Sequence, residues 1–239
     1  MEDISLQAKI DVLSEEQVLI QDSAVAFIAR DPELKQVRAN RFVQPGFDRG
    51  LWREIADAGW LGFLVPEDEG GVGLGFADLS LVLIQLGKGL VPVPFVATAV
   101  LAARTLTRAD DAALRAELLP RLIGGDWLPA LAWQEARASL DPTAREVVCT
   151  NGRLHGTKCF VPDAGGADAF IVSAAEAGGT ALYLVERDAP GVTLAFEQRV
   201  DGGFFAEIRF ADTPVGKQLV APERGAAVPA AALDEARLG

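Results

Sequence analysis

Few side chains in this sequence belong to the types that usually carry out chemistry. There is one histidine, His155, and there are two cysteines, Cys149 and Cys159. A single histidine excludes a His-rich metal site, and the two cysteines fall in expected strands rather than in a metal-binding motif. We therefore expect His155 to be structural, and we expect no bound metal, no disulfide framework and a reducing, cytoplasmic location.

Among the carboxylates, Glu135 invites assignment as a catalytic base, the group that would remove a proton from a substrate. A carboxylate on a surface loop is nevertheless the more ordinary outcome for such a residue. We therefore expect Glu135 to lie on a surface loop, and we assign it no part in the chemistry.

A glycine-rich stretch, Pro66 to Phe76 (PEDEGGVGLGF), invites interpretation as a dinucleotide-binding loop. It fails that test because no strand precedes it and because Phe76 occupies the sixth position of the G-x-G-x-x-G pattern. The acidic residues Glu67, Asp68 and Glu69 would also repel a pyrophosphate. We therefore interpret this stretch as a structural loop.

Composition limits the classes of partner. The chain has 239 residues, half of them hydrophobic, and a net charge of -12, so it can bury a sizeable core but lacks the basic surface that nucleic acid or an anionic membrane requires. Its N-terminus has no basic region followed by an apolar segment, and no apolar run reaches the ~18 residues of a membrane helix. We expect no signal peptide, no nucleic-acid binding and no membrane insertion.

The first half of the chain has the periodicity and capping residues of α-helices. The expected helices run from Ser14 (a capping box with Gln17) to Arg30, from Asp48 to Gly59, through Leu79 to Leu86, from Phe95 to Leu106, and from Asp110 or Asp111 to Gly124-Gly125. Pro120 is expected to break or kink the last helix, and Glu33 to Phe47 are interpreted as a polar connection, in part helical. Five helices with short connections predict an α-helical bundle.

After Asp126 the pattern changes to short apolar runs separated by Gly, Pro, Asn and Asp, which is typical of β-structure. Asn151-Gly152 is a strong signal for a type I′ hairpin turn, because that turn needs two positive φ angles. The expected strands are Leu128–Trp133, Glu146–Thr150, Arg153–Val161, Ala169–Ala174, Ala181–Val185, Val192–Val200 and Phe204–Phe210. The tail from Ala226 becomes helical again.

The sequence therefore predicts an α+β multidomain fold. An N-terminal all-α bundle is expected at residues 1–126, a β-barrel or sandwich domain at residues 127–222, and the start of a C-terminal helical domain at residues 223–239. Trp52, Trp60 and Trp127 are expected in the core, as is usual for large aromatic side chains.

Five short motifs occur in a characteristic order. They are V-P-E-(acidic)-x-G-G-x-G-L at Val65 to Leu74, L-G at Leu86-Gly87, L-x-x-G at Leu122 to Gly125, A-x-x-E at Ala132 to Glu135, and G-T-K-x-F-V at Gly156 to Val161. Each motif alone is weak, but in this order, over roughly residues 15 to 239, they resemble the acyl-CoA dehydrogenase family.

The resemblance implies an FAD-dependent oxidoreductase of fatty acid or lipid metabolism that desaturates the Cα–Cβ bond of an acyl-CoA thioester. In that family a carboxylate removes the α-proton while the β-hydride passes to the flavin. The implied partners are the acyl-CoA substrate, an electron-transfer flavoprotein or similar electron acceptor, and further subunits in a homo- or hetero-oligomer.

The resemblance also implies cofactor-binding residues. In the family a T-E-P-G-x-G-S-D segment wraps the pyrimidine side of the flavin, and here it aligns with Trp133 to Asp141. Gln134 replaces the Thr and can donate through its backbone or its amide, and Ser139 lies one position from the Ser of the family. Trp133 itself suits the β-core and a flavin contact equally well.

A second set of implied cofactor contacts follows the lysine of the G-T-K motif. Phe160 stands where the family has an aromatic residue against the flavin ring, and Val161 follows it. Pro162 stands where the family often has Thr, which removes a hydroxyl group. With Trp133, Gln134 and Ser139, these residues make up the expected flavin site.

In the family, the catalytic base belongs to a C-terminal helical bundle that these 239 residues lack. We therefore assign no catalytic residue, and we expect no acyl-CoA oxidation by the 239 residues alone. They are either part of a longer enzyme or a naturally short chain that works with a partner subunit. The loss of the Thr, of the Ser and of the hydroxyl at Pro162 supports an alternative function, a non-catalytic scaffold subunit paired with an active relative.

Overall fold

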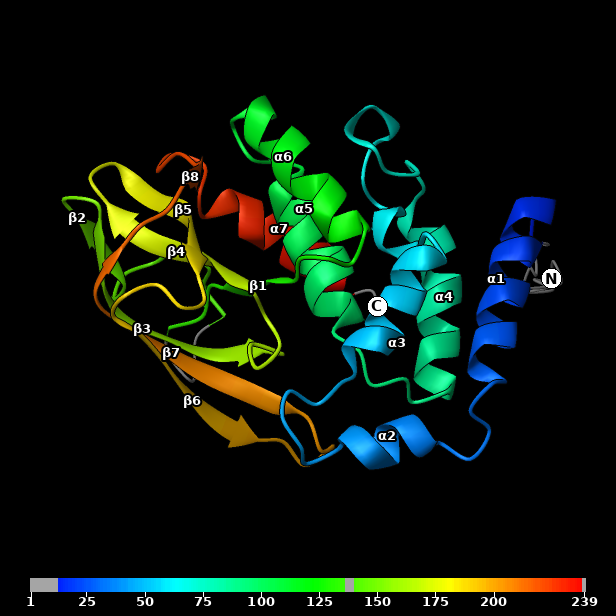
Figure 1. Cartoon of the computed structure of the whole chain (residues 1–239). Helices are drawn as coiled ribbons and strands as arrows, with labels where there is room; N and C mark the ends of the chain where they lie inside the picture. The colour runs from blue at the N-terminus through cyan, green and yellow to red at the C-terminus, as the bar shows by residue number, and fades with distance from the viewer. Residues whose placement is uncertain (1–12, 136–139, 238–239) are drawn as a thin grey trace, which may run out of the picture.

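The computed structural model describes residues 13–135 and 140–237, and helices precede strands along the chain (Figure 1). The helical part consists of α1 (Glu15–Ile28), α2 (Lys35–Asn40), α3 (Arg49–Asp57), 3-10 turns at Trp60–Gly62 and Glu67–Glu69, α4 (Phe76–Lys88), a π-helix (Val96–Ala102), α5 (Ala103–Leu106) and α6 (Ala112–Ile123). A last helix, α7 (Ala227–Ala236), packs against the π-helix and α5. Within the described ranges, no helix has the length and apolar character that crossing a membrane requires.

The helix ends follow the capping residues that the sequence predicts. Ser14 accepts a hydrogen bond from the Gln17 N–H, and the Gln17 side chain accepts one from the Ser14 N–H, which completes a capping box. Asp48 caps α3, and Asp111 caps α6. Gly59 follows α3 with a φ of +78°, a left-handed conformation that glycine adopts without steric cost.

The structure refines two helical predictions. Within the expected polar connection, residues 35–40 form α2, and the Asp31 carboxylate accepts hydrogen bonds from the Lys35 and Gln36 N–H groups at 2.8 Å each. The prediction of a break or a kink at Pro120 is wrong as to the break, because α6 continues to Ile123, and the kink stays a prediction. Proline removes only one hydrogen bond, and the same helix gains more from the burial of Leu118, Leu119 and Leu122.

The strands form a mixed sheet in the order β6-β7-β3-β2-β4-β5-β8, with β1 paired to β4 outside this path. Their bounds are β1 (Pro129–Ala132), β2 (Val148–Thr150), β3 (Arg153–Pro162), β4 (Ala169–Glu176), β5 (Gly179–Glu186), β6 (Val192–Gln198), β7 (Phe204–Pro214) and β8 (Gln218–Val220). β1 and β2 run parallel to β4. Strand β8 was not predicted, because three residues are too few to show alternation.

The strand connections agree with the turn signals of the sequence. Asn151 and Gly152 join β2 to β3 with φ angles of +51° and +71°, as a type I′ turn requires. β4 and β5 pair without a shift in register from Ala169 opposite Glu186 to Glu176 opposite Gly179. The predicted fold class is confirmed, and the domain boundaries after residues 126 and 222 stay predictions.

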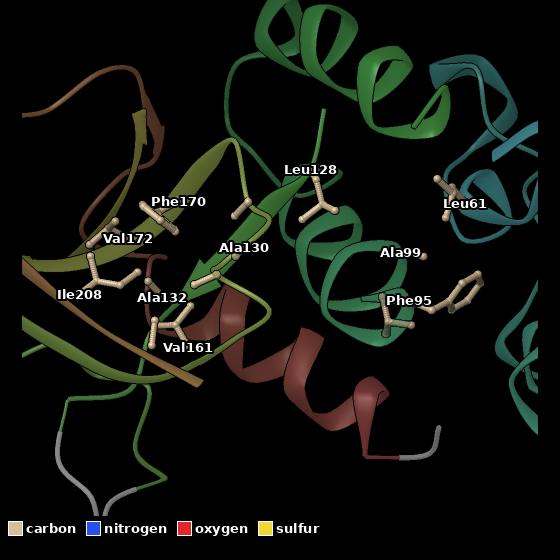
Figure 2. Close-up of a cluster of buried hydrophobic side chains, with 14 of the residues drawn as sticks. Leu61, Phe95, Ala99, Leu128, Ala130, Ala132, Val161, Phe170, Val172 and Ile208 are labelled. Atoms are coloured by element: carbon tan, nitrogen blue, oxygen red, sulfur yellow. The ribbon is translucent and has the colours of Figure 1, made fainter. Parts of the chain in front are cut away.

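The hydrophobic core runs without interruption from the helices to the sheet. Figure 2 shows Leu128, Ala130 and Ala132, in and just before β1, between helical side chains such as Leu61 and sheet side chains such as Phe170. All of these residues are buried. The prediction that the tryptophans belong to the core is also confirmed, because Trp52, Trp60 and Trp127 are almost fully buried.

Candidate functional site

A β-bulge in β3 shapes the first part of the candidate site. Lys158 lies opposite Ile208 and Val161 lies opposite Ala206, so two residues of β3, Cys159 and Phe160, face a single residue of β7. Such a bulge redirects side chains and is common beside active sites. Phe160 has a φ of +52°, and its ring meets the Phe205 ring edge-on with 5.7 Å between centroids.

The segment that follows β1 lies alongside this bulge. The Cys159 N–H donates to the Gln134 carbonyl oxygen at 2.8 Å, and the Cys159 thiol donates to the Glu135 carbonyl oxygen at 3.1 Å. Trp133 and Gln134 are only partly buried. The structure thus brings Trp133 and Gln134 close to Phe160. These residues belong to two separate sequence motifs, and both motifs were expected to contact the same ligand.

The other residues expected to contact a flavin occupy different surroundings. The Val161 side chain is buried in the core next to Ala132, so only its backbone could meet a ligand (Figure 2). Pro162 lines a cleft described below. Trp133 packs in part against a cluster of buried side chains around β4, β5 and α7, so core packing accounts for part of its surface. Ser139 lies outside the described residues.

The expectation that Glu135 lies on a surface loop is wrong. Its side chain is only 8% exposed, and its carboxylate lies 2.8 Å from the Lys158 Nζ. It also accepts hydrogen bonds from the N–H groups of three consecutive residues, Arg145 (2.7 Å), Glu146 (2.8 Å) and Val147 (3.0 Å). Burial alone would raise the pKa of Glu135, but Lys158 and these hydrogen bonds hold it below its usual value.

Lys158 is the partner of this carboxylate and is fully buried. Its ammonium group donates to Glu135, to the Ser173 hydroxyl at 2.7 Å and to the Trp133 carbonyl oxygen at 3.2 Å. Burial lowers the pKa of Lys158 to about 8, although the Glu135 charge opposes this shift. Sequence reasoning missed this role, and the available signal was a lysine directly before the apolar run Cys159 to Pro162 within a strand.

A cleft of about 450 Å³ opens where the helices meet the sheet. Its helical walls are mostly apolar and come from the end of α4, from Leu90 to Val93, and from the start of the π-helix, while Pro162 forms part of its sheet side. π-Helical turns are rare and often mark functional sites. Sequence periodicity predicted an ordinary helix from Phe95 to Leu106, and the first part of that helix is π-helical instead.

One end of the cleft is charged. Of the residues that line it, Asp163 and Arg199 carry charge, and both also line an adjoining hollow of about 340 Å³. Burial raises the pKa of Asp163 to about 6, a rise that Arg199 opposes and Asp201 reinforces. Arg199 pairs with Asp201 and lies 4.7 Å from the centroid of the Phe205 ring. Sequence reasoning missed this end, because β3 and the β6–β7 turn bring the two residues together from distant positions.

The histidine and the two cysteines do not line the cleft. The His155 side chain is 54% exposed, and its Nε2 lies 3.6 Å from an Asp212 carboxylate oxygen at the surface. Cys149 and Cys159 are buried and not joined in a disulfide. In the part of the chain that the structure describes, no three His, Cys, Asp or Glu residues are grouped so as to hold a metal ion.

The site could hold a flat, partly polar ring beside an apolar chain. Trp133 and Phe160 supply aromatic surface, and the Gln134 amide can both donate and accept hydrogen bonds. Pro162 connects these positions to the cleft, whose walls suit an apolar chain. The fold and this arrangement therefore define a class of protein, in which a helical part and a mixed sheet enclose a ligand cleft at their junction.

Comparison with known proteins shows which family within this class the chain is similar to. Residues 14–126 match the model of the acyl-CoA dehydrogenase N-terminal domain. The chain is 35% identical over 148 residues to acyl-CoA dehydrogenase FadE27 of Mycobacterium tuberculosis, covering 62% of this chain and 39% of that protein. It is 28% identical over 198 residues to the mitochondrial isovaleryl-CoA dehydrogenase of Pongo abelii, covering 76% and 46%. The chain is therefore similar to the acyl-CoA dehydrogenase family in its helical part and in part of its sheet.

Solved structures agree with this assignment. A steroid ACAD variant, Tcur3481-Tcur3483 G363A, superposes with a TM-score of 0.78 at 30% identity, covering 94% of this chain and 63% of that one. The ChsE4-ChsE5 complex of Mycobacterium tuberculosis superposes with a TM-score of 0.81 at 25% identity, covering 95% and 62%. The chain spans about half the length of the curated relatives that it matches.

Proposed function

We propose that this chain forms the flavin-contacting and acyl-binding part of an FAD-dependent acyl-CoA dehydrogenase, an oxidoreductase that desaturates the Cα–Cβ bond of an acyl-CoA thioester. The observation that carries the proposal is the meeting of Trp133 and Gln134 with the Phe160 bulge, directly beside an apolar cleft. Similarity to the family supports the same reaction class.

In this proposal the chain binds and orients, while the bound FAD accepts the hydride. Trp133 and Phe160 hold the flat ring by aromatic contact, and Gln134 supplies hydrogen bonds to its polar edge. The cleft takes up the acyl chain and excludes water from it, since most of its lining side chains are apolar.

We propose that the base that removes the α-proton lies outside these 239 residues, as the family resemblance implies. Glu135 does not suit this role, because its carboxylate already accepts hydrogen bonds from Lys158 and three backbone N–H groups. Its lowered pKa also makes it a weaker base, whereas an efficient general base has a pKa near the working pH. The cytoplasmic location, an electron-transfer flavoprotein as acceptor and an oligomeric state stay predictions.

A titration with FAD tests the proposal. The purified chain is mixed with increasing FAD, and binding is followed by the loss of flavin fluorescence. We expect Trp133→Ala and Phe160→Ala to weaken binding about tenfold, because each removes an aromatic contact. Phe42→Ala is the matched control, since Phe42 is 53% exposed and does not line the cleft. Equal affinities of all three variants, or no binding by the unaltered chain, would argue against the proposed flavin site.

The second candidate function is a non-catalytic scaffold subunit that pairs with an active relative. Pro162, in place of the hydroxyl residue frequent in the family, favours it. Two similar structures, ChsE4-ChsE5 and Tcur3481-Tcur3483, are named as pairs of proteins, which supports the same function. Co-expression with the product of a neighbouring gene separates the two functions. A scaffold should be colourless alone and should restore flavin binding and activity only in the mixed complex.

A further inference from the structure

The ion pair between Lys158 and Glu135 has a complete set of hydrogen bonds. Each of the three ammonium N–H groups of Lys158 has an acceptor, namely Glu135, Ser173 or the Trp133 carbonyl oxygen. The Glu135 carboxylate has four donors, two on each oxygen, of which three are backbone N–H groups of residues 145–147. No hydrogen-bonding capacity of either charged group is left for a substrate.

Stability alone is a poor explanation for such a pair. Taking two charges out of water costs several kcal/mol per ion, and apolar replacements of buried ion pairs are often neutral or stabilising. Lys158 is fully buried and its partner nearly so. The function of the pair is therefore better explained by the fixed positions that it gives to the groups around it than by a contribution to stability.

That geometry links both halves of the candidate flavin site. Lys158 immediately precedes the bulge residues Cys159 and Phe160. The same ammonium group holds the Trp133 carbonyl oxygen, and Cys159 holds the carbonyl oxygens of Gln134 and Glu135. Three consecutive carbonyl groups after β1 are thus attached to two consecutive residues of β3.

The pair also ties this junction to the rest of the sheet. Ser173, which receives the second ammonium hydrogen bond, belongs to the centre of β4 and is fully buried. The Glu135 carboxylate accepts hydrogen bonds from the backbone N–H groups of residues 145–147, directly before β2. Movement of Trp133 relative to Phe160 would therefore disturb contacts to β3, to β4 and to the segment before β2.

We propose that Glu135 and Lys158 are positioning residues that set the separation between Trp133 and Phe160, and that this separation determines how tightly the flavin ring is held. The proposal rests on the proposed flavin site and assigns to the pair an effect on ligand geometry beyond its effect on folding. Neither residue contacts the cofactor in this arrangement.

The test uses a double variant, Glu135→Gln with Lys158→Met, which removes both charges at nearly constant volume. The side-chain oxygen of the introduced glutamine can still accept from the backbone of residues 145 and 146. The matched control is Glu69→Gln with Arg115→Met, which removes a partly buried ion pair between the 3-10 turn at Glu67–Glu69 and α6, whose residues do not line the cleft. We expect the dissociation constant for FAD to rise at least about tenfold in the first variant and less than about twofold in the control.

A second readout does not depend on FAD. The Cys159 amide, which donates to Gln134, should exchange its hydrogen at least about tenfold faster in the double variant, while β4 amides such as those of Phe170 and Ile171 keep their protection. If the unaltered chain binds no FAD, the proposed function fails, and hydrogen exchange alone decides the positioning role. Unchanged exchange at Cys159, or FAD binding weakened no more than in the control, would overturn the proposal.

Ser173→Ala provides a milder variant in case the double variant does not fold. It removes one of the three acceptors of Lys158 and leaves the ion pair in place. We expect this variant to fold and to bind FAD about threefold more weakly, with faster exchange at Cys159. An FAD affinity and a Cys159 exchange rate equal to those of the unaltered chain would contradict the proposal.

Discussion

Arg104 of α5 forms a bidentate ion pair with Glu235 of α7. The Arg104 Nε lies 2.5 Å and the Nη2 3.0 Å from the two carboxylate oxygens, and Arg108 adds a third contact at 2.5 Å. All three side chains are about three-quarters buried. Because α7 follows the sheet in sequence but packs on the helices, this cluster attaches the end of the described chain to the helical part.

Glu235→Gln should therefore destabilise the protein. The substitution leaves two partly buried guanidinium groups without their counter-charge, and we expect the free energy of unfolding to fall by about 1–3 kcal/mol. Urea denaturation followed by circular dichroism measures this change. Asp234→Asn, one residue earlier and largely exposed, is the control and should change stability by less than about 0.5 kcal/mol. Equal midpoints for the two variants would show that the cluster does not hold α7.

Asp163 should make stability depend on pH. Its pKa of about 6 in the folded protein exceeds the ordinary value of 3.8, so between these two pH values the folded state binds more protons than the unfolded state. The free energy of unfolding should therefore fall as the pH rises from about 4 to about 6, and the penalty should remain above pH 6.

Asp163→Asn should remove this penalty and raise the free energy of unfolding at pH 7 by up to about 3 kcal/mol, with little effect at pH 4. Urea titrations at pH 4, 5, 6 and 7 provide the comparison. Asp188→Asn, at an exposed position, serves as the control and should leave the pH profile unchanged. A pH profile for Asp163→Asn that runs parallel to that of the unaltered chain would contradict the assignment.

Gly156→Ala should be strongly destabilising. Gly156 has a φ of +129°, and a Cβ atom there would lie 2.5 Å from the Glu146 carbonyl oxygen and 2.8 Å from the Val147 Cα. We expect a loss of about 2–4 kcal/mol, measured as a fall in the thermal midpoint. Gly87→Ala is the matched control, because an added Cβ would meet no atom within 4 Å other than those of its chain neighbours and of the surrounding helix backbone. That helical site should gain up to about 1 kcal/mol. A midpoint for Gly156→Ala at or above that of the control would refute this prediction.

Filling the cleft should weaken binding of acyl chains. Ala97 lines the cleft from the π-helix, and Ala97→Leu adds three carbon atoms to its wall. On the proposed function, we expect the affinity for long-chain acyl-CoA to fall by about tenfold or more, as measured by isothermal titration calorimetry, with a smaller effect on short chains. Ala113→Leu on the exposed face of α6 is the control. The cleft is not the acyl site if both variants bind all chain lengths alike.

Local chemistry made much of the fold predictable. The capping box at Ser14 and the Asn151-Gly152 turn act over a few residues, so the sequence specifies them directly. The helical period also predicted the helix through Leu79 to Leu86, which lies within α4. Agreement was poorest where tertiary packing overrides local preference, as at Pro120 and in the π-helix.

The candidate site was less predictable, because it depends on contacts between distant strands. The motifs pointed to Phe160 and Gln134, but only the pairing of β3 with β7 reveals the bulge that redirects Phe160. Glu135 was expected at the surface, since no local pattern indicates that Lys158 lies beneath it. The charge of Asp163 within the cleft likewise arises from the way helices and sheet meet.

The position of β1 has a consequence for how the protein unfolds. Leu128, Ala130 and Ala132 contribute to the same core as the helices and as the other strands (Figure 2). Loss of the helical part would expose this strand to water, and loss of the sheet would do the same. Because each part covers apolar surface of the other, neither part can unfold alone without exposing that surface to water. The described chain should therefore unfold as one cooperative unit, with a single calorimetric transition in spite of its two-part architecture.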